Sequence, residues 1–566
     1  MGFFGRIHGP EFTRLFLACT PPGGWPKTIA VANSGGPDSS CLLFLLHELM
    51  QATVGAMSLP KKVVSLTVDH GLQAESALMA EQAASVASKL GVEHHTVKIP
   101  WGETPFPPLP AGDNAFESIA RLARFRVLFE AMKKTGAPVL ALGHHADDQV
   151  ETSLIRIAKG TTEMGAGGMR KCRRWGMGLG KEGDLGWTGY EGMSRWMVRP
   201  LLSVRKEKIL TTCKEAEISY VQDKTNFQPE ITIRNAIRHI INNDVVDKGA
   251  FSKTLPEHIR EGMENMQARA ESLEGASFDL SAGSEQLRAT VLSLSRRVDD
   301  IDEEVNAHLK AIRVSGPPGT FVMSHPTAAK IQNETIRARI IQRILRYVSF
   351  HPWGSLRADG NRRGSSLSRI VANVWDPQPQ RQANFIAGGG VMWIPAVFKH
   401  NKLQFIDFGK QENVSASGSL VWVATRAPPL GANKLKAMNM DNPLNMDVTA
   451  ALLAAVAQYK HNASTPKTVE FLYDCRFVVT FDISKIPNSI LRYLEELDGR
   501  LFIITQTRWY WPRVVLKPSE GGQVVLESEM PKVEIGTIQQ WRWEDRSGVV
   551  KSKWIESRWI RPLDAI

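Results

Sequence analysis

The sequence predicts an α/β protein: a parallel-sheet domain over residues 28–240, a helical middle region over 241–350 and a β-rich, α+β region over 351–566, after an N-terminal extension. Two observations carry this prediction. Apolar, β-branched runs alternate with segments of helical spacing, and polar clusters follow the runs. Such strands form a parallel sheet with right-handed crossovers. Ligands bind beyond the carboxyl ends of these strands, so the polar clusters mark the expected site.

The elements of the first domain can be placed in chain order. Apolar runs predict strands, and segments of helical spacing predict the helices between them. The predicted strands are residues 28–33, 63–68, 94–99 and 138–142; the predicted helices begin at residue 41 and cover residues 76–90, 114–134 and 203–216. We expect a basic, mobile loop over residues 160–200, and a strand and turn over residues 220–226.

The composition fits a soluble protein of two to four domains with excess positive charge. Its 566 residues exceed one core, and 43% apolar and 22% charged residues are ordinary values. The net charge of +11 favours a partner with many phosphates; a generally basic surface is the alternative. We find no apolar segment that could cross a bilayer and expect an intracellular, soluble protein without a membrane partner. Mitochondrial matrix or cytoplasm, and the oligomeric state, are left open.

A turn of small residues follows the first predicted strand and precedes a helix. The backbone N–H groups and the positive helix end at such a junction point to one place, which suits a phosphate. Glycines let an anion approach the backbone, and serines add hydroxyl donors. Asp38 would act there through Mg²⁺; the alternative is that Asp and Ser only cap the helix. The residues of this turn are Ser34, Gly35, Gly36, Pro37, Asp38, Ser39 and Ser40.

A second polar cluster, residues 143–152, follows the strand predicted over residues 138–142. Asp147, Asp148 and Glu151 lie within about one helical turn, so two or three of them share a face. Like charges this close need a cation or hydrogen bonds, and Mg²⁺ with a nucleotide is the natural cation. Helix capping by Asp147 and Asp148 is the alternative, and it is compatible with metal binding.

Zinc and disulfides are disfavoured. His144 and His145 are accompanied by no cysteine and no third suitably spaced histidine. The five cysteines are scattered and contain no Cys-x-x-Cys pair, which fits a reducing compartment.

Basic residues gather in two further stretches. Arg170, Lys171, Arg173 and Arg174 follow a glycine-rich segment and predict a clamp for a polyanion, with a solvated insertion as the alternative. Elsewhere two arginines one helical turn apart, Arg234 and Arg238, can grip phosphates, although exposed arginines on helices are usually only solvated.

The rest of the chain is predicted more coarsely. Residues 247–313 have a helical pattern with near-heptad apolar positions, which favours a helical arm packed on the rest. Near the C-terminus tryptophans alternate with arginines; we favour tryptophans in the core of small sheets over tryptophans that stack on bases. The remaining predictions are a helix at 328–348, a flexible or loop-bearing region at 354–383, strands at 391–397, 403–408 and 420–423, and a helix at 449–459.

Three motifs in order resemble the tRNA(Ile)-lysidine synthetase family. Residues 34–39 are similar to the pyrophosphatase loop of ATP-using adenylating enzymes, and no Walker Gly-Lys-Ser or Gly-Lys-Thr occurs. Val-Asp-His-Gly-Leu at 68–72, Ala-Arg-Leu-Ala-Arg-Phe at 120–125 and the cluster at 143–152 resemble that family within the superfamily. Two further features also match: Arg-Pro-Leu-Leu at 199–202, and the pattern of Asp223, Asn226, Arg234, Asn235 and Arg238. Asn33 stands where an apolar residue is usual.

The resemblance implies an adenine-nucleotide alpha hydrolase-like fold and a ligase. ATP adenylates the C2 carbonyl oxygen of the first-anticodon cytidine of an isoleucine tRNA and releases pyrophosphate; the ε-amine of free L-lysine then attacks C2, and AMP leaves. ATP would bind at residues 34–40 with His70, Gly143 and His144, and Mg²⁺ at Asp38 and Asp147. The implied catalytic residues are Asp38, Asp147, Asp148, Glu151 and Arg121, of which Asp148 and Glu151 suit a lysine ammonium. The implied tRNA contacts are Arg124, Arg170, Lys171, Arg173, Arg174, Arg234 and Arg238.

Two alternatives stay open at the level of sequence. A tRNA thiolase of the same superfamily is the nearest; thiolases that use an iron–sulfur cluster or a persulfide relay need grouped cysteines, which this chain lacks. A tRNA-binding protein without catalysis is the other. The intact loop and acidic cluster argue against it, and Asn33 argues for it.

Overall fold

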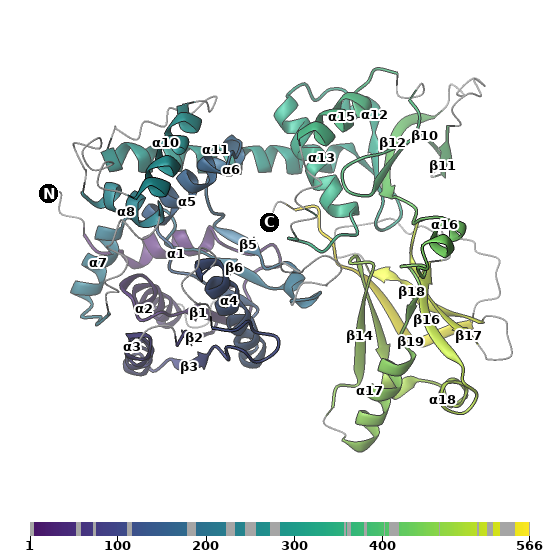
Figure 1. The fold of residues 1–566 in the computed structure, drawn as a ribbon, viewed down its shortest axis with the longest axis horizontal. Helices are drawn as coiled ribbons and strands as arrows, with labels where there is room; N and C mark the ends of the chain where they lie inside the picture. Colours follow the sequence, from purple (N-terminus) through teal and green to yellow (C-terminus); the bar gives the residue numbers. More distant parts are fainter. Residues whose placement is uncertain are drawn as a thin grey trace. The chain divides into compact units, whose positions relative to one another are not determined.

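The structure is a computed structural model of the chain (Figure 1). It describes residues 5–52, 58–71, 75–109, 116–177, 188–221, 233–243, 256–271, 283–355, 358, 364–378, 382–400, 402–406, 418–462, 465–505, 509–517, 524–532 and 550–564. The chain divides into two compact units, one of Met1–Trp175 and Ser194–Ile301, the other of Gly176–Met193 and Asp302–Ala565. The four-part division expected at residues 28, 241 and 351 stays a prediction, because a two-unit division does not test it.

The first unit contains a six-stranded sheet. Its order is β3-β2-β1-β4-β6-β5, and all neighbouring pairs are parallel except β5 with β6. The strands are β1 (Thr28–Ala32), β2 (Lys62–Asp69), β3 (Glu93–Lys98), β4 (Val139–Ala141), β5 (Cys172–Arg174) and β6 (Trp196–Val198). The predicted parallel sheet is confirmed. The central β1, β2 and β4 are largely buried, as expected for parallel strands covered on both faces.

One local prediction in this unit is wrong, and another lies mostly outside the described residues. The segment predicted as a loop over residues 160–200 contains α6 (Glu163–Ala166), β5, η1 (Glu191–Ser194) and β6. Trp196, Met197 and Val198 are buried and extend the sheet beyond β4, a place that an apolar run occupies more favourably than a solvated loop. Residues 220 and 221 are not in a strand, and the rest of that predicted strand and turn lies outside the described residues.

Helices of the first unit follow the predicted pattern. They are α1 (Gly9–Leu17), α2 (Pro37–Ala52), α3 (Glu75–Lys89), α4 (Phe116–Thr135), α5 (Ala146–Ala158), α7 (Lys206–Glu215), α8 (Ile233–Asn243), α10 (Glu257–Glu271) and α11 (Gly283–Ile312). The N-terminal extension belongs to this core: Phe12 and Phe16 of α1 are buried, and Phe16 stacks on Trp25 with ring centroids 3.9 Å apart.

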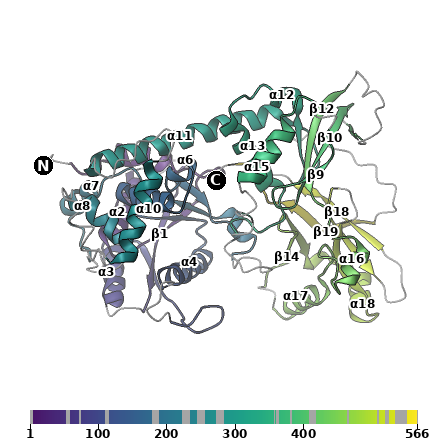
Figure 2. The ribbon, with the colours of Figure 1, turned by 45° about the horizontal axis from the view of Figure 1, so that its top comes forward.

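The helices that follow the sheet pack on α5. Val150 and Leu154 of α5 share one buried core with Ile237 of α8, Met266 of α10 and Leu287 of α11. Figures 1 and 2 both show α11 running beside α10 and α6. The predicted packing of a helical arm on the rest of the protein is therefore confirmed. It brings the first turns of α11 to the N-terminal end of α5, where the second polar cluster lies.

The second unit contains two mainly antiparallel sheets, and the predicted β-rich C-terminal region is confirmed. The first has the order β11-β10-β12-β8-β7, with β9 on β10; the second has the order β13-β16-β17-β18-β19-β15-β14, in which only β18 and β19 run parallel. The first sheet comprises β7 (Arg313–Val314), β8 (Phe321–Ser324), β9 (Phe385–Ile386), β10 (Val391–Lys399), β11 (Lys402–Phe405) and β12 (Ser419–Arg426). The second comprises β13 (Met446–Asp447), β14 (Thr468–Tyr473), β15 (Phe477–Asp482), β16 (Arg500–Thr505), β17 (Pro512–Lys517), β18 (Val524–Lys532) and β19 (Val550–Trp559).

Helices of the second unit correct two predictions. They are α12 (His325–Ala328), α13 (Glu334–Val348), α15 (Gly364–Val374), α16 (Ala432–Ala437), α17 (Thr449–His461), η4 (Ile483–Lys485) and α18 (Asn488–Glu495). The helix predicted at 328–348 begins at Glu334 instead, because Asn333 caps α13 by accepting the N–H groups of Thr335 and Ile336. The region predicted as flexible or loop-bearing, 354–383, contains α15, since Leu367, Ile370 and Val374 repeat at helical spacing and are buried.

The structure bears on two predictions about side chains, the core position of the C-terminal tryptophans and the absence of disulfides. Trp509, Trp511, Trp554 and Trp559 are buried, so the interpretation of these tryptophans as core residues is confirmed; Trp541 and Trp543 lie outside the described residues. All five cysteines are free thiols. In the part of the chain that the structure describes, we find no helix with the length and apolar character needed to span a membrane.

Candidate active site

The small-residue turn joins the end of β1 to the start of α2. Gly35 has φ = 77°, and a Cβ there would lie 2.4 Å from the Met79 carbonyl oxygen. A Cβ on Gly143, just after β4, would lie 2.9 Å from the backbone of Asp38. Glycine at both positions lets neighbouring backbone come this close. Because α2 begins at Pro37, the N–H groups of Asp38 and Ser39 have no acceptor within the helix and lie at its positive end.

Asn33 closes this turn against the sheet. It is 1% exposed, and its Oδ1 accepts the N–H of Gly35 at 3.1 Å and the hydroxyl of Ser39 at 3.2 Å. Its Nδ2 donates to Ser65 Oγ at 3.2 Å and to the Ala83 carbonyl at 3.3 Å. An apolar residue could make none of these bonds. The residue that departs from the family pattern therefore fixes the shape of the turn.

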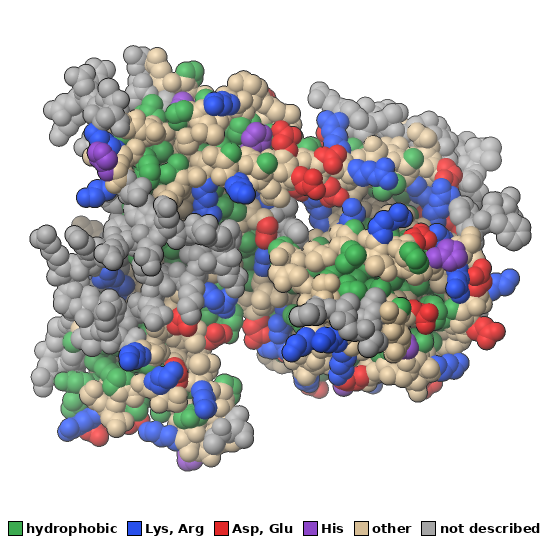
Figure 3. Space-filling view, turned by 180° about the vertical axis from the view of Figure 1, so that it is seen from behind, with side chains coloured by type: hydrophobic (Ala, Val, Ile, Leu, Met, Phe, Trp, Pro, Cys, Tyr) green, Lys and Arg blue, Asp and Glu red, His purple; other side chains and the backbone are tan. Residues whose placement is uncertain are grey.

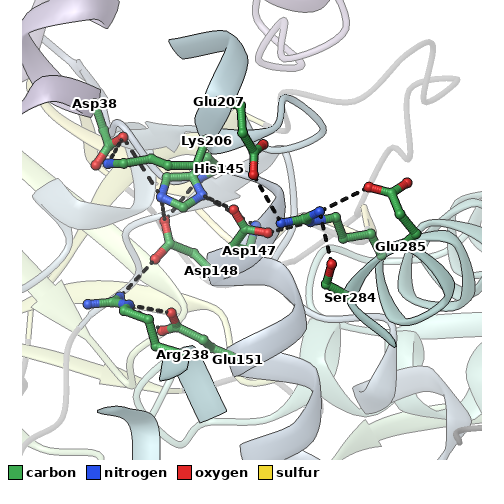
Figure 4. Close-up of polar contacts among 11 residues, drawn as sticks. Asp38, His145, Asp147, Asp148, Glu151, Lys206, Glu207, Arg238, Ser284 and Glu285 are labelled. Carbon is green, nitrogen blue, oxygen red and sulfur yellow. Dashed lines mark hydrogen bonds and ion pairs between the residues drawn. The ribbon is translucent and has the colours of Figure 1, made fainter. Parts of the chain in front are cut away.

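Three candidate carboxylates surround His145 at the start of α5, and Figure 4 shows them pointing toward its ring. Its Nε2 lies 3.8 Å from Asp38 Oδ1 and 3.5 Å from Asp148 Oδ2, and its Nδ1 lies 3.6 Å from Asp147 Oδ2. His145 is also the helix cap: Nδ1 accepts the N–H of Asp147 at 3.3 Å, and Asp148 accepts the N–H of His145 at 3.0 Å. Capping by Asp148 is thus confirmed, and the loop and the acidic cluster meet at one histidine.

The two carboxyls one turn apart on α5 have opposite pKa shifts. Burial alone would raise the pKa of Asp148, but His145, His144 and the hydrogen bond from the His145 N–H lower it to about 2. Burial raises the pKa of Glu151 despite two arginines beside it. Arg238 donates to Glu151 at 2.8 and 3.1 Å, and Arg234 donates at 3.0 Å. Both predicted tRNA contacts on α8 therefore hold a candidate catalytic carboxylate in this structure.

Sequence reasoning missed two basic residues of the site. Lys206 Nζ, from the first turn of α7, lies 2.5 Å from Asp38 Oδ1. Arg288 Nε, from α11, lies 2.5 Å from Asp147 Oδ1. Lys206 could have been noticed because it follows the Arg-Pro-Leu-Leu motif by four residues. Arg288 carries no such signal, since it is one of many charged residues on a long amphipathic helix.

Asp147, one of the two predicted magnesium ligands, fits a cation that is shared with a nucleotide, whereas Asp38 Oδ1 is paired with Lys206. Asp147 is 3% exposed, and its Oδ2 has no hydrogen-bond partner among the described residues. A buried acceptor left unpaired is unusual and marks a place where an ion or ligand can bind. Within the described ranges, no three His, Cys, Asp or Glu side chains are grouped to hold a metal by themselves. Mg²⁺ needs no such cage, because it commonly takes one or two carboxylates and completes its shell with phosphate oxygens and water.

Basic side chains gather around His144 beside the loop. Burial lowers the pKa of His144 to about 3, and the charge of Arg199 adds to the shift, so this imidazole is neutral at physiological pH. Arg121 and Arg124 of α4 act in the same direction. Burial, Arg173 and Arg121 lower the pKa of Arg199 to about 9. Arginines that repel one another at the edge of a site favour an anionic ligand.

The other predicted nucleotide and tRNA contacts differ in their surroundings. Burial and the charge of Arg124 lower the pKa of His70 to about 4. Arg170 and Lys171 each lie 3.1 Å from Asp299 of α11, and the guanidinium of Arg174 lies 4.2 Å from the centre of the Trp196 ring. Arg173 is exposed. Lys and Arg side chains are spread over the face drawn in Figure 3, so no single patch in that view defines an RNA site.

Comparison with known proteins bears on the N-terminal part of the chain. This part contains a parallel sheet, a glycine-rich turn after the first strand of that sheet, and the acidic start of α5 opposite the turn. Residues 17–245 match the model of the PP-loop domain family. The matched PP-loop domain covers less than half of the chain and includes β1 to β6 and α2 to α8.

Relatives over the same region are tRNA(Ile)-lysidine synthases. The enzyme of a Bradyrhizobium species is 32% identical over 250 residues, which are 44% of this chain and 60% of the relative. That of Bacillus subtilis is 35% identical over 217 residues, 38% of this chain and 39% of the relative. That of Bradyrhizobium diazoefficiens is 33% identical over 199 residues, 35% of this chain and 47% of the relative. The expected family resemblance is confirmed, and the chain spans between 39% and 60% of the length of these relatives.

Among solved structures, the U34-tRNA thiolase NcsA from Methanococcus maripaludis, with its [4Fe-4S] cluster, shares 17% identity. It covers 50% of this chain and 86% of its own, with a TM-score of 0.31. A likeness at that level carries no argument for or against thiolation.

Proposed function

We propose that this protein is a tRNA(Ile)-lysidine synthetase: an ATP-dependent ligase that joins free L-lysine to C2 of the first-anticodon cytidine of an isoleucine tRNA. One observation supports it above the others. The PP-loop and the acidic helix start meet at His145, with Asp38 and Asp147 oxygens 3.8 and 3.6 Å from its ring nitrogens. Activation of a base by ATP needs both parts together, a cradle for phosphate and carboxylates for a cation.

In the first step the C2 carbonyl oxygen of the cytidine attacks the α-phosphorus of ATP and pyrophosphate leaves. The N–H groups of Asp38 and Ser39 and the hydroxyls of the turn hold the phosphates, and Asn33 keeps the turn in shape for them. Mg²⁺, when bound by Asp147 and Asp38, would neutralise charge on the phosphates.

In the second step the ε-amine of lysine attacks C2, loses a proton, and AMP leaves. Glu151 and Asp148 are the acids that suit the lysine ammonium. Glu151 is fully buried and holds Arg234 and Arg238, so a lysine ammonium at this carboxylate displaces at least one guanidinium. A displaced arginine is then available to a phosphate of ATP or tRNA, which reconciles the contacts seen here with the predicted tRNA role.

Incorporation of labelled lysine into total tRNA tests the proposal directly. We expect full-length protein with ATP to label tRNA, and Asp38→Ala to abolish labelling. Glu93→Gln, which removes an exposed acid of β3 in the same unit, serves as the control and should label normally. Salt should weaken tRNA binding steeply, because phosphate contacts release counterions. Binding that does not change with salt would contradict a tRNA substrate.

The product separates this activity from its alternatives. Nucleoside mass analysis should show cytidine condensed with lysine. A base that gains sulfur instead would identify a thiolase, and tRNA binding without tRNA-dependent ATP–pyrophosphate exchange would identify a non-catalytic binder. Either result overturns the proposal.

A further inference from the structure

Arg288 reaches the candidate site from outside the matched PP-loop domain. It lies on α11, and its side chain is only 11% exposed. Its Nε contacts Asp147 of α5 at 2.5 Å, its Nη1 donates to Glu285 at 3.0 Å, and its Nη2 lies 3.6 Å from Glu207 of α7. One planar guanidinium therefore ties three helices together, with the edge that carries Nε turned to Asp147. Figure 4 labels the three acids that it contacts, Asp147, Glu207 and Glu285.

Arg288 makes the two oxygens of Asp147 different. Oδ1 accepts from Arg288. Oδ2 has no hydrogen-bond partner among the described residues and lies 3.6 Å from His145 Nδ1. That nitrogen already accepts the N–H of Asp147, so it has no proton to give to Oδ2. The unpaired oxygen is thus the one beside His145 Nδ1, while Asp38 lies beside the other ring nitrogen, Nε2.

We infer that Arg288 is a positioning residue for Asp147: by taking Oδ1 it fixes the carboxylate so that Oδ2 is left without a hydrogen-bond donor from the described residues and can bind a divalent cation that accompanies the nucleotide. The inference rests on the proposed function only in assigning ATP and a divalent cation to this place. The C–C torsion at the end of an aspartate side chain is soft, so a carboxylate without this partner rotates to other donors.

Charge and position make opposite predictions for the loss of Arg288. If the guanidinium acted only by its charge, removing it would strengthen cation binding, because a positive neighbour would be gone. If it acts by position, removing it weakens cation binding, because Oδ2 is no longer held in place. The sign of the change therefore separates the two roles.

Direct Mn²⁺ binding to the full-length protein measures that sign without tRNA, lysine or turnover. Electron paramagnetic resonance of free Mn²⁺, with a non-hydrolysable ATP analogue present, gives the dissociation constant. We expect Arg288→Gln to weaken Mn²⁺ binding about tenfold, and Arg288→Lys, which keeps the charge but loses the planar fork, about threefold. Arg297→Gln is the matched control. It removes an exposed arginine of the same helix that pairs with Glu163 at 3.0 Å, and it should bind Mn²⁺ like the wild type.

A double-mutant cycle tests whether Arg288 acts through Asp147. Asp147→Asn alone should weaken Mn²⁺ binding at least as much as Arg288→Gln, and the double variant should be no weaker than Asp147→Asn. Wild-type binding by Arg288→Gln, tighter binding, or a full additional loss in the Asp147→Asn background would each overturn the inference. If Arg288→Gln fails to fold by circular dichroism, Arg288→Lys decides: unchanged binding in that variant overturns the inference.

The outcome is separable from that of the proposed function. A protein that binds Mn²⁺ through Asp147 and Arg288 but adds no lysine to tRNA refutes the ligase and leaves the inference standing. A protein that adds lysine, and whose Arg288→Gln variant binds Mn²⁺ as tightly as the wild type, refutes the inference alone.

Discussion

Two buried aspartates, Asp147 in the first unit and Asp474 in the second, are both paired with arginine, and they differ in how completely they are paired. Both side chains are 5% exposed. Arg426 Nε lies 3.1 Å from Asp474 Oδ1 and 2.9 Å from its Oδ2, and Arg476 Nε donates to Oδ2 at 2.8 Å. Both oxygens of Asp474 are occupied by the protein itself, whereas Oδ2 of Asp147 has no hydrogen-bond partner among the described residues.

A third buried arginine near Asp474, Arg561, is also paired within the fold. Arg561 is 1% exposed and donates to the carbonyls of Cys475 at 2.8 Å, Arg346 at 3.1 Å and His351. Burial lowers its pKa to about 10. Asp474 thus belongs to a cluster that satisfies its acids from within the fold. A carboxylate whose two oxygens are both paired specifies a structure, and a carboxylate with one unpaired oxygen is prepared for a ligand.

The largest effect we expect is on stability, at Asp474. Asp474→Asn leaves Arg426 and Arg476 buried without their counter-charge, which should lower the free energy of unfolding by about 3–5 kcal/mol. Urea titration followed by tryptophan fluorescence measures it. The control is Asp482→Asn, which breaks a pair with the exposed Lys485 and should change stability by less than about 1 kcal/mol. Equal effects of the two substitutions would remove the distinction between the clusters.

The corresponding change in the first unit should act on function. Asp147→Asn should reduce tRNA-dependent ATP–pyrophosphate exchange by about 100-fold, which is about 2.7 kcal/mol of transition-state stabilisation. We expect its stability to change less than that of Asp474→Asn, because only one carboxylate oxygen of Asp147 is paired with an arginine. An Asp147→Asn variant that keeps full exchange activity but unfolds readily would show that both aspartates are structural.

Local features of the site could be predicted from the sequence, and contacts between distant segments could not. The strands, the turn at residues 34–40 and the capping by Asp148 depend on neighbouring residues, so their spacing was enough. Arg288 reaches Asp147 only because α11 packs on α5 through Leu287 and Val150, and no local pattern encodes that contact. The strand at residues 196–198 was missed because tryptophans and basic residues around it suggested a solvated insertion.

Asn33 is a residue whose role could not be predicted from the sequence, although its position attracted notice. Its position was recognised as a departure, and from sequence alone it argued against catalysis. In the folded chain its Oδ1 accepts two hydrogen bonds from the turn, and its Nδ2 donates two more to Ser65 of β2 and Ala83 of α3, which are distant in sequence. A departure from a family pattern is therefore weak grounds for loss of function until its partners are known.

A third prediction follows for that residue. Asn33→Leu should lower the free energy of unfolding by about 2–3 kcal/mol, because the N–H of Gly35 and the hydroxyl of Ser39 lose a buried acceptor. ATP affinity, measured by calorimetry on the folded fraction, should fall in parallel. Thr67→Val is the control: it removes a buried bond to the backbone carbonyl of Asn33 and leaves the Asn33 side chain bonded to the turn. It should lower stability without lowering ATP affinity, and an equal loss of affinity would contradict the role of the Asn33 side chain.

The smallest effect concerns pH, and it compares the two carboxyls one turn apart on α5. The pKa of Asp148 is lowered from 3.8 to about 2, so its ionised form stabilises the fold above pH 4 and this contribution is lost as pH falls toward 2. The ionised carboxylate of Asp148 should contribute about 2 kcal/mol to the stability difference between wild type and Asp148→Asn at pH 6, and about half of that at pH 3. The pKa of Glu151 is raised, so its contribution is present below the ordinary glutamate pKa and is lost as pH rises. The difference between wild type and Glu151→Gln should therefore change with pH in the opposite direction. Urea titrations at pH 3, 4, 5 and 6 give the slope of each stability difference against pH. Two slopes of the same sign would show that the pKa values of these two acids are not shifted in opposite directions, as the structure indicates.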